Sequence, residues 1–136
     1  MPRIAVERVH GAARRAVIKG LEAANAPVLG KVEFRPLTIT LREGSKIVGG
    51  LVGESFLGWL YVSALWVADD YCGRGYGTRI MQAAEKEAGR RGVTGVYLDT
   101  LSFQAPGFYA KLGYREFGRL DNFPAGQDRR WLAKAL

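Results

Sequence analysis

The apolar positions along the chain change their spacing several times, and each spacing predicts one kind of element. Apolar residues at intervals of three and four predict helices, whereas alternating positions or short apolar runs between turn residues predict strands. The expected helices are Gly11–Asn25, ended by Pro27 and Gly30, Gly75 to about Arg91, and a short one at Pro106–Leu112. The expected strands are Ile4–Val9, Phe34–Arg42, Lys46–Gly53, Trp59–Val67, Val93–Leu101, Tyr114–Leu120 and Arg129–Ala135.

The stretch from residue 59 to residue 101 indicates how the strands are arranged. Trp59–Val67 is the most apolar run, and the helix after it carries apolar residues along one side and leads to a second apolar strand. A strand–helix–strand crossover of this length pairs its strands in parallel, whereas the last two strands form an antiparallel pair. We therefore expect one domain over residues 1–136, of the α/β (α+β) class. Its sheet should be mixed, mostly antiparallel and six- to seven-stranded, with helices on both faces.

A glycine-rich turn joins the apolar strand to the helix, in the sequence Cys72-Gly73-Arg74-Gly75-Tyr76-Gly77-Thr78. Its glycines let the backbone turn sharply and approach a ligand, and the helix start points unpaired N–H groups at the same place. The alternative is a turn that only redirects the chain, but Arg74 and Arg79 add positive charge typical of a phosphate site. The spacing fits neither the dinucleotide turn G-x-G-x-x-G nor the nucleotide-hydrolase loop G-x-x-x-x-G-K-[ST].

The composition narrows the class of ligand. A net charge of +7 favours anions, but the basic residues are scattered and no zinc-finger or single-strand-binding motif appears, so nucleic acid is not the expected partner. His10 is the only histidine and Cys72 the only cysteine, so neither a metal site nor an internal disulfide is expected. We expect a cytoplasmic protein, because the sequence shows no leader and no apolar span of about 20 residues.

A second motif follows the next strand, in the sequence Ala105-Pro106-Gly107-Phe108-Tyr109-Ala110-Lys111-Leu112-Gly113-Tyr114. It matches the pattern A-x-x-[FL]-Y-x-K-x-G-[FY], and the turn at 72–77 matches [RQ]-x-x-G-x-[GA] except at its first residue. Together, in this order of elements, the two motifs resemble the GNAT superfamily of acetyl-CoA-dependent N-acetyltransferases. The resemblance covers essentially the whole chain. It implies a GNAT-like sheet whose parallel strands, the fourth and fifth along the chain, splay apart.

The resemblance also implies how acetyl-CoA (coenzyme A) would be held. The amides of residues 73–78 would bind the pyrophosphate, and the backbone of residues 65–67 would pair with the pantetheine arm. A free amide near Val67 would polarise the thioester carbonyl. The cofactor-binding residues it implies are Leu65, Trp66, Val67, Gly73, Arg74, Gly75, Tyr76, Gly77, Thr78 and Ser102. Two departures are visible: Cys72 replaces the usual Arg or Gln, and Ser102 stands where many members have Asn.

Tyr109 matches the residue that protonates the departing thiolate in many members of the family. A phenol suits this role because it donates a proton without being charged beforehand. The alternative is that Tyr109 only packs, as its aromatic neighbours Phe108 and Tyr114 do. If the resemblance holds, Tyr109 is the general acid.

The general base has no motif. Many members place a glutamate on the fourth strand, but the matching positions here are Tyr61 and Ser63. The candidates are therefore Glu54, Asp99 or an ordered water.

The resemblance implies direct transfer of an acetyl group from acetyl-CoA to a primary amine in a ternary complex. A small-molecule acceptor is favoured over a protein, and several aromatic residues suggest a small or flat amine: Phe56, Trp59, Tyr61 and Phe123. The alternative is a non-catalytic acyl-CoA-binding or sensing module, which the missing glutamate favours and Tyr109 opposes. Many members are dimers, so a homodimer stays open, although the sequence shows no interface.

Overall fold

The computed structural model describes residues 1–136 as two compact units, Met1–Val32 and Glu33–Leu136. The first unit contains one helix, α1 (Gly11–Leu29), which is longer than predicted. Pro27 lies inside the last turn of α1, so the prediction that it ends the helix is wrong. Gly30 does end the helix, and its N–H donates to the Ala26 carbonyl at 2.9 Å.

The prediction of a strand at Ile4–Val9 is wrong. These residues are exposed and belong to no sheet. Apolar residues at strand spacing do not make a strand unless a neighbouring strand satisfies the backbone N–H and C=O groups.

No helix of the structure has both the length and the apolar character needed to cross a membrane.

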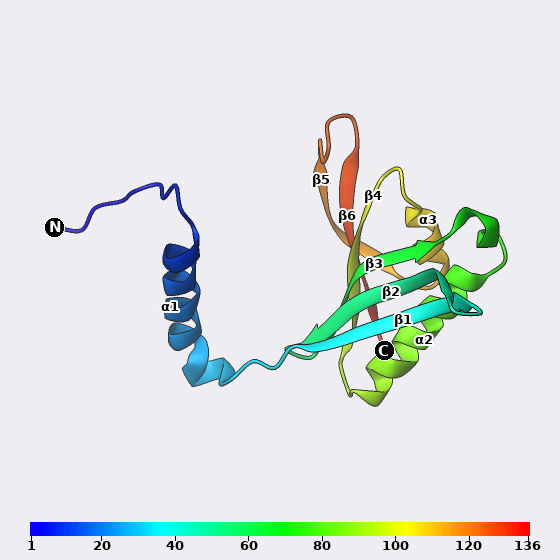
Figure 1. Ribbon diagram of the computed structural model, residues 1–136, viewed down its shortest axis with the longest axis horizontal. Helices are drawn as coiled ribbons and strands as arrows, with labels where there is room; N and C mark the ends of the chain where they lie inside the picture. Colours follow the sequence, from blue (N-terminus) through cyan, green and yellow to red (C-terminus); the bar gives the residue numbers. More distant parts are fainter. The chain divides into compact units, whose positions relative to one another are not determined.

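The second unit is a six-stranded sheet with two α-helices (Figure 1). Its elements are β1 (Arg35–Glu43), β2 (Lys46–Phe56), β3 (Trp59–Val67), α2 (Tyr76–Arg90), β4 (Gly95–Leu101), α3 (Pro106–Lys111), β5 (Arg115–Asp121) and β6 (Asp128–Ala135), with a 3-10 turn at Asp69–Tyr71. The strand order is β1-β2-β3-β4-β6-β5, and only β3 and β4 pair in parallel. The predicted α/β class, with a mixed, mostly antiparallel sheet and one parallel pair, is confirmed.

The strand β2 continues to Phe56, beyond its predicted end at Gly53. Leu57 and Gly58 form a two-residue turn to β3, with φ of 49° and 85°. Positive φ at both positions is the geometry of a type I′ turn, whose twist matches that of a hairpin. Leucine is uncommon at such a position, so the sequence signalled the turn weakly.

The hydrophobic core lies between α2 and one face of the sheet. Ile80, Met81, Ala84 and Ala88 of α2 are buried, because their spacing places them on one side of the helix. They pack against the buried strand residues Leu37, Leu51, Leu60, Val62, Val96, Leu98 and Leu132. Residues of α3, including Tyr109, pack against the same cluster. Both helices of this unit therefore contact the core face.

The parallel strands β3 and β4 separate partway along their length. They pair only over Trp59–Val62 of β3. Directly beyond Val62, Ser63 is an extra residue, because Val62 and Ala64 lie opposite consecutive residues of β2. A β-bulge of this kind bends its strand, and the Ser63 hydroxyl secures it by donating to the Val52 carbonyl at 3.1 Å. The end of β3 therefore stays with β2, while the end of β4 pairs only with β6.

Arg91 fastens the C-terminal end of α2 to the first two strands. Its guanidinium donates to the carbonyls of Arg35 and Pro36 at 2.9 and 3.0 Å and to the Ser55 hydroxyl at 3.1 Å. Its Nε pairs with Glu87 at 3.0 Å, and only 9% of the side chain is exposed. These contacts fix the position of α2 on the sheet, and hence the place to which its N-terminus points.

A substitution at Gly53 can test the close approach of β2 to β3. A Cβ at this residue would lie 2.4 Å from the Tyr61 carbonyl oxygen, so the two backbones would have to move apart. We expect Gly53→Ala to lower the free energy of unfolding by about 1–3 kcal/mol in a urea titration. Gly89→Ala is the matched control, because no atom lies within 4 Å of its Cβ position and it lies inside α2. The control should be neutral or stabilising, and equal effects of the two substitutions would contradict this packing.

Candidate active site

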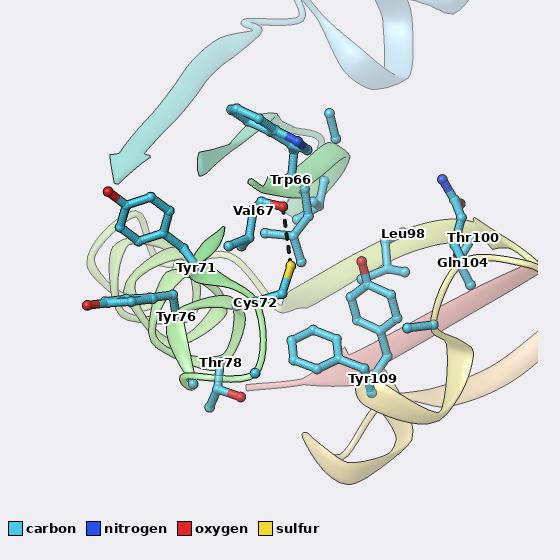
Figure 2. A pocket seen from close by; sticks show the side chains of 18 of the residues that line it. Trp66, Val67, Tyr71, Cys72, Tyr76, Thr78, Leu98, Thr100, Gln104 and Tyr109 are labelled. Atoms are coloured by element: carbon cyan, nitrogen blue, oxygen red, sulfur yellow. Dashed lines mark hydrogen bonds between the residues drawn. The ribbon is translucent and has the colours of Figure 1, made fainter. Parts of the chain in front are cut away.

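A groove of about 850 Å³ occupies the space between the separated ends of β3 and β4 (Figure 2). Its walls are the end of β3, the turn at residues 71–78, the end of β4 and the start of α3. Most of the residues expected to bind acetyl-CoA line it, namely Leu65, Trp66, Val67, Gly73, Gly75, Tyr76, Gly77 and Thr78. Asp99 and Tyr109 line it as well, so the structure brings both sequence motifs and one candidate base to one place.

The glycine turn presents free N–H groups to the groove. Gly73 and Gly75 have φ of +75° and +83°, and no atom lies within 4 Å of either Cβ position. Glycine is favoured at such angles, and the open space lets a ligand approach the backbone. No side chain caps α2, whose first backbone hydrogen bond joins the Arg79 N–H to the Gly75 carbonyl. The amides of residues 73–78 therefore fit an anion such as a pyrophosphate.

Two arginines beside this turn have no carboxylate partner. Arg74 lies 5.5 Å from the ring centre of Tyr71, and Arg79 lies 5.6 Å from that of Tyr76. Neither forms an ion pair. Stacking on an aromatic ring holds a guanidinium in place and leaves its edge free to donate to phosphate. Neither arginine is among the residues that line the groove, although both adjoin residues that do.

The end of β3 offers unpaired backbone groups along one wall. The Ala68 N–H donates to the Val48 carbonyl at 2.8 Å, which continues the ladder with β2. Bonded and non-bonded positions alternate along an antiparallel ladder, so the N–H and C=O groups of Leu65 and Val67 point away from β2. Because β4 pairs with β3 only as far as Val62, no strand meets these groups. An extended ligand could pair with them as an added strand.

Cys72 joins the glycine turn to the end of β3. Its Sγ lies 3.5 Å from the carbonyl oxygens of Val67 and Ala68, and Figure 2 marks the first of these contacts. A thiol is a weak donor with a short reach. Cys72 therefore steadies the turn but offers a ligand less than the longer Arg or Gln usual at this position.

Tyr109 enters the groove from the core face of the sheet. Its ring packs edge-on against Phe108 and Tyr114, with ring centres 5.0 and 6.0 Å away. Figure 2 shows its hydroxyl directed into the groove, toward Leu98. Burial raises the pKa of Tyr109, and the negative charge of Asp99 adds to the shift. The phenol is therefore protonated at neutral pH and available as a donor.

Asp99 reaches the groove from the opposite face of the sheet, since its neighbours Leu98 and Thr100 in β4 are buried on the core face and side chains alternate along a strand. The Tyr61 hydroxyl donates to Asp99 Oδ2 at 2.6 Å. Arg129 donates to Asp99 Oδ1 through Nε at 2.9 Å and through Nη2. Two of the three partners of this network, Asp99 and Arg129, lie on the adjacent strands β4 and β6.

Three residues expected at the site lie outside the lining of the groove, namely Arg74, Glu54 and Ser102. Glu54 lies opposite Tyr61 in the β2–β3 ladder. Its charge contributes to the raised pKa of Tyr97, of which burial is the main cause. Ser102 is occupied elsewhere: its hydroxyl donates to Gln127 Oε1 at 2.6 Å and accepts the Asp128 N–H at 3.0 Å.

Gln104 lines the groove and was not predicted. Its Oε1 accepts the Leu101 N–H at 2.9 Å and lies 3.3 Å from the Thr100 hydroxyl. The amide NH₂ is therefore free to donate. The only sequence signal was its position directly before the second motif.

Comparison with known proteins identifies the family. The profile of the Acetyltransferase (GNAT) domain matches residues 36–116. Acetyltransferase Atu2258 of Agrobacterium fabrum is 37% identical over 123 residues, which cover 90% of each chain. Blasticidin-S acetyltransferase of Streptomyces morookaense is 38% identical over 110 residues, covering 77% of this chain and 81% of the relative. A crystal structure of an acetyltransferase from Bacillus cereus superposes with a TM-score of 0.79 and 30% identity, covering 100% of this chain and 98% of that one.

These matches and the fold define a GNAT acetyltransferase domain, and the chain belongs to that family. It is an N-acetyltransferase that takes its acetyl group from acetyl-CoA.

The titration of Tyr61 tests its contact with Asp99. Burial raises the pKa of Tyr61 to about 12, and the hydrogen bond to Asp99 adds to the shift. A raised pKa means that this phenol stabilises the fold fully below its ordinary value of 10.0, and that the contribution is lost as the pH rises through about 12. We expect Asp99→Asn to move the pKa of Tyr61 down toward 10.0, measured by tyrosinate absorbance with Tyr61→Phe identifying the phase. An identical titration in Asp99→Asn would contradict the contact.

Proposed function

We propose that this protein transfers the acetyl group of acetyl-CoA to the primary amine of a small molecule, by direct attack in a ternary complex. The observation that carries the proposal is the opening between β3 and β4, which side chains reach from both faces of the sheet. Tyr109 lies on the core face and Asp99 on the other, and both line the same groove. A donor bound along the groove and an acceptor entering from the Asp99 face would meet at this opening.

Acetyl-CoA would be held by the residues that line the groove. The amides of 73–78 with the charges of Arg74 and Arg79 suit its pyrophosphate, and the backbone groups of Leu65 and Val67 that no strand meets suit its pantetheine arm. The free amide of Gln104 would donate a further hydrogen bond to that arm. These assignments rest on the free donors and acceptors of the groove.

When bound, acetyl-CoA supplies a thioester that accepts the amine nitrogen and releases the thiol of coenzyme A. The Val67 N–H would donate to the carbonyl oxygen as negative charge develops there. The Tyr109 hydroxyl would give its proton to the departing sulfur. The amine would lose its proton to water, because Glu54 lies outside the groove and the oxygens of Asp99 already accept hydrogen bonds from Arg129 and Tyr61.

A flat acceptor is the best match to the face on which Asp99 lies. Tyr61 and Tyr97 stack there with ring centres 4.9 Å apart, and Phe123 and Trp131 stand edge-on at 6.5 Å. Aromatic surfaces of this kind bind planar rings by stacking. The similarity to a blasticidin-S acetyltransferase supports blasticidin S as the first acceptor to test.

The direct test combines binding and turnover. Acetyl-CoA should raise the melting temperature of the protein, and thiol release from acetyl-CoA should then be measured with blasticidin S, an aminoglycoside and simple aliphatic amines. We expect faster thiol release with at least one amine and acetylated amine as the product. Stabilisation without amine-dependent thiol release would instead indicate a protein that binds acyl-CoA without transferring its acyl group.

Tyr109→Phe tests the general acid. The substitution removes one oxygen and keeps the ring that packs against Phe108 and Tyr114, so we expect kcat to fall about 100-fold or more. The dissociation constant of acetyl-CoA should stay the same, measured by calorimetry. Phe108→Leu is a packing control that should affect stability more than chemistry. A normal kcat in Tyr109→Phe would rule out the acid role.

Cys72→Gln tests whether this position limits cofactor affinity. A glutamine restores a long side chain with two N–H donors at the start of the loop. One additional hydrogen bond would tighten binding of acetyl-CoA about two- to tenfold. Cys72→Ala removes the thiol contact without adding a hydrogen-bond donor, so it shows the effect of losing the thiol alone. It should leave the affinity for acetyl-CoA nearly unchanged. Weaker binding of acetyl-CoA by Cys72→Gln would show that the shorter thiol is needed at this place.

A further inference from the structure

The carboxylate of Asp99 is held in one orientation and has one acceptor position left. An ionised carboxylate offers about four positions for hydrogen bonds. Two on Oδ1 are taken by Nε and Nη2 of Arg129, and one on Oδ2 is taken by the Tyr61 hydroxyl. Only 15% of the Asp99 side chain is exposed, and Asp99 is one of the residues that line the groove. The remaining position, on Oδ2, is therefore the one available to a molecule in the groove.

Arg129 is itself fixed by aromatic rings. Its guanidinium carbon lies 4.7 Å from the ring centre of Phe123 and 5.3 Å from that of Trp131. Phe123 belongs to the loop between β5 and β6, and Gln127 of the same loop is tied to Ser102 at the end of β4. The loop, the rings and the guanidinium thus hold Asp99 from the side opposite Tyr61.

The guanidinium also changes what Asp99 can bind. A lone carboxylate beside an amine favours the charged ammonium, which has no electron pair for attack on a thioester. The fixed positive charge of Arg129 offsets that preference and leaves Asp99 Oδ2 as a hydrogen-bond acceptor. Tyr61 remains a neutral donor, since its pKa is raised by burial and by Asp99.

We propose that Asp99 orients the acceptor by accepting an N–H of its neutral amine at Oδ2, with Tyr61 and Arg129 as positioning residues that keep the amine nucleophilic. This rests on the proposed function and adds the residues that select the protonation state of the acceptor. The electron pair of the amine nitrogen then faces the thioester carbonyl at the opening between β3 and β4. The groups that face Asp99 are Tyr61 on β3, Tyr97 on β4, Arg129 on β6 and Tyr109 on α3, with Glu54 on β2 beyond Tyr97.

The first test separates orientation from base catalysis, with blasticidin S as acceptor and the most active amine of the panel as a second one. We expect Asp99→Asn to lower kcat/KM for the acceptor about 10- to 100-fold. The KM of acetyl-CoA and its thermal stabilisation should not change, and the acidic limb of the kcat–pH profile should remain. Loss of that limb would make Asp99 the base and overturn the proposal, as would an unchanged kcat/KM.

The second test concerns the charge of Arg129. Arg129→Met leaves Asp99 as an unpaired carboxylate that favours the ammonium, so the acidic limb of kcat should move to higher pH by about one unit or more. Arg129→Lys restores a positive charge and should bring the limb back, even if stability is lower. A purely structural role would reduce stability in both variants without moving the limb, and that result would overturn the proposal.

The two proposals fail in different ways. If wild-type protein turns over no amine although acetyl-CoA stabilises it, amine transfer itself is wrong, and the role of Asp99 fails with it. If wild-type protein turns over an amine and the Asp99 and Arg129 variants keep its kinetics and pH profile, only the role of Asp99 and its partners is wrong.

Discussion

The separation of β3 from β4 is the constraint on which the rest of the structure depends. Ending a parallel ladder inside a sheet leaves backbone N–H and C=O groups without partners, which is unfavourable unless something else pairs with them. The extra residue Ser63 bends β3, which stays paired with β2, and Gly53 permits the close approach of the two backbones next to the bend. The unpaired groups then form a wall of the groove. The strand pairing that is lost in the fold is thus available to an extended ligand.

The distribution of charge matters more than its total. The net charge of +7 says only that the protein favours anions. Around the groove the positive charge is free at one end, where Arg74 and Arg79 have no carboxylate partner. At the other end Arg129 is paired with Asp99. One groove can therefore offer a cationic surface to a pyrophosphate and a nearly neutral one to an amine. A uniformly basic groove would repel a protonated acceptor.

Much of this arrangement was readable from the sequence, because it follows from local patterns. The bounds of β3 are those predicted from its apolar run, and the glycine spacing located the start of α2 within one residue. The parts that were missed depend on contacts between distant segments. Asp99 meets Arg129 only because β4 pairs with β6, and that register is not visible in either strand alone. Ser102 lies outside the lining of the groove for the same reason, since its partners Gln127 and Asp128 lie in the β5–β6 loop and at the start of β6.

The neighbouring Asp99 explains why a tyrosine occupies position 61. Many members of the family carry a glutamate on this strand, and here the groove takes its carboxylate from β4 instead. A glutamate at position 61 would place a second negative charge beside Asp99, which like-charge repulsion disfavours. A phenol in that place donates a hydrogen bond to the carboxylate and stays neutral. The two residues therefore form one unit, in which Tyr61 sets the orientation of Asp99 and Arg129 sets its effective charge. A carboxylate held in this way is better suited to align an amine than to remove its proton, because Arg129 and Tyr61 already take three of its hydrogen-bond positions.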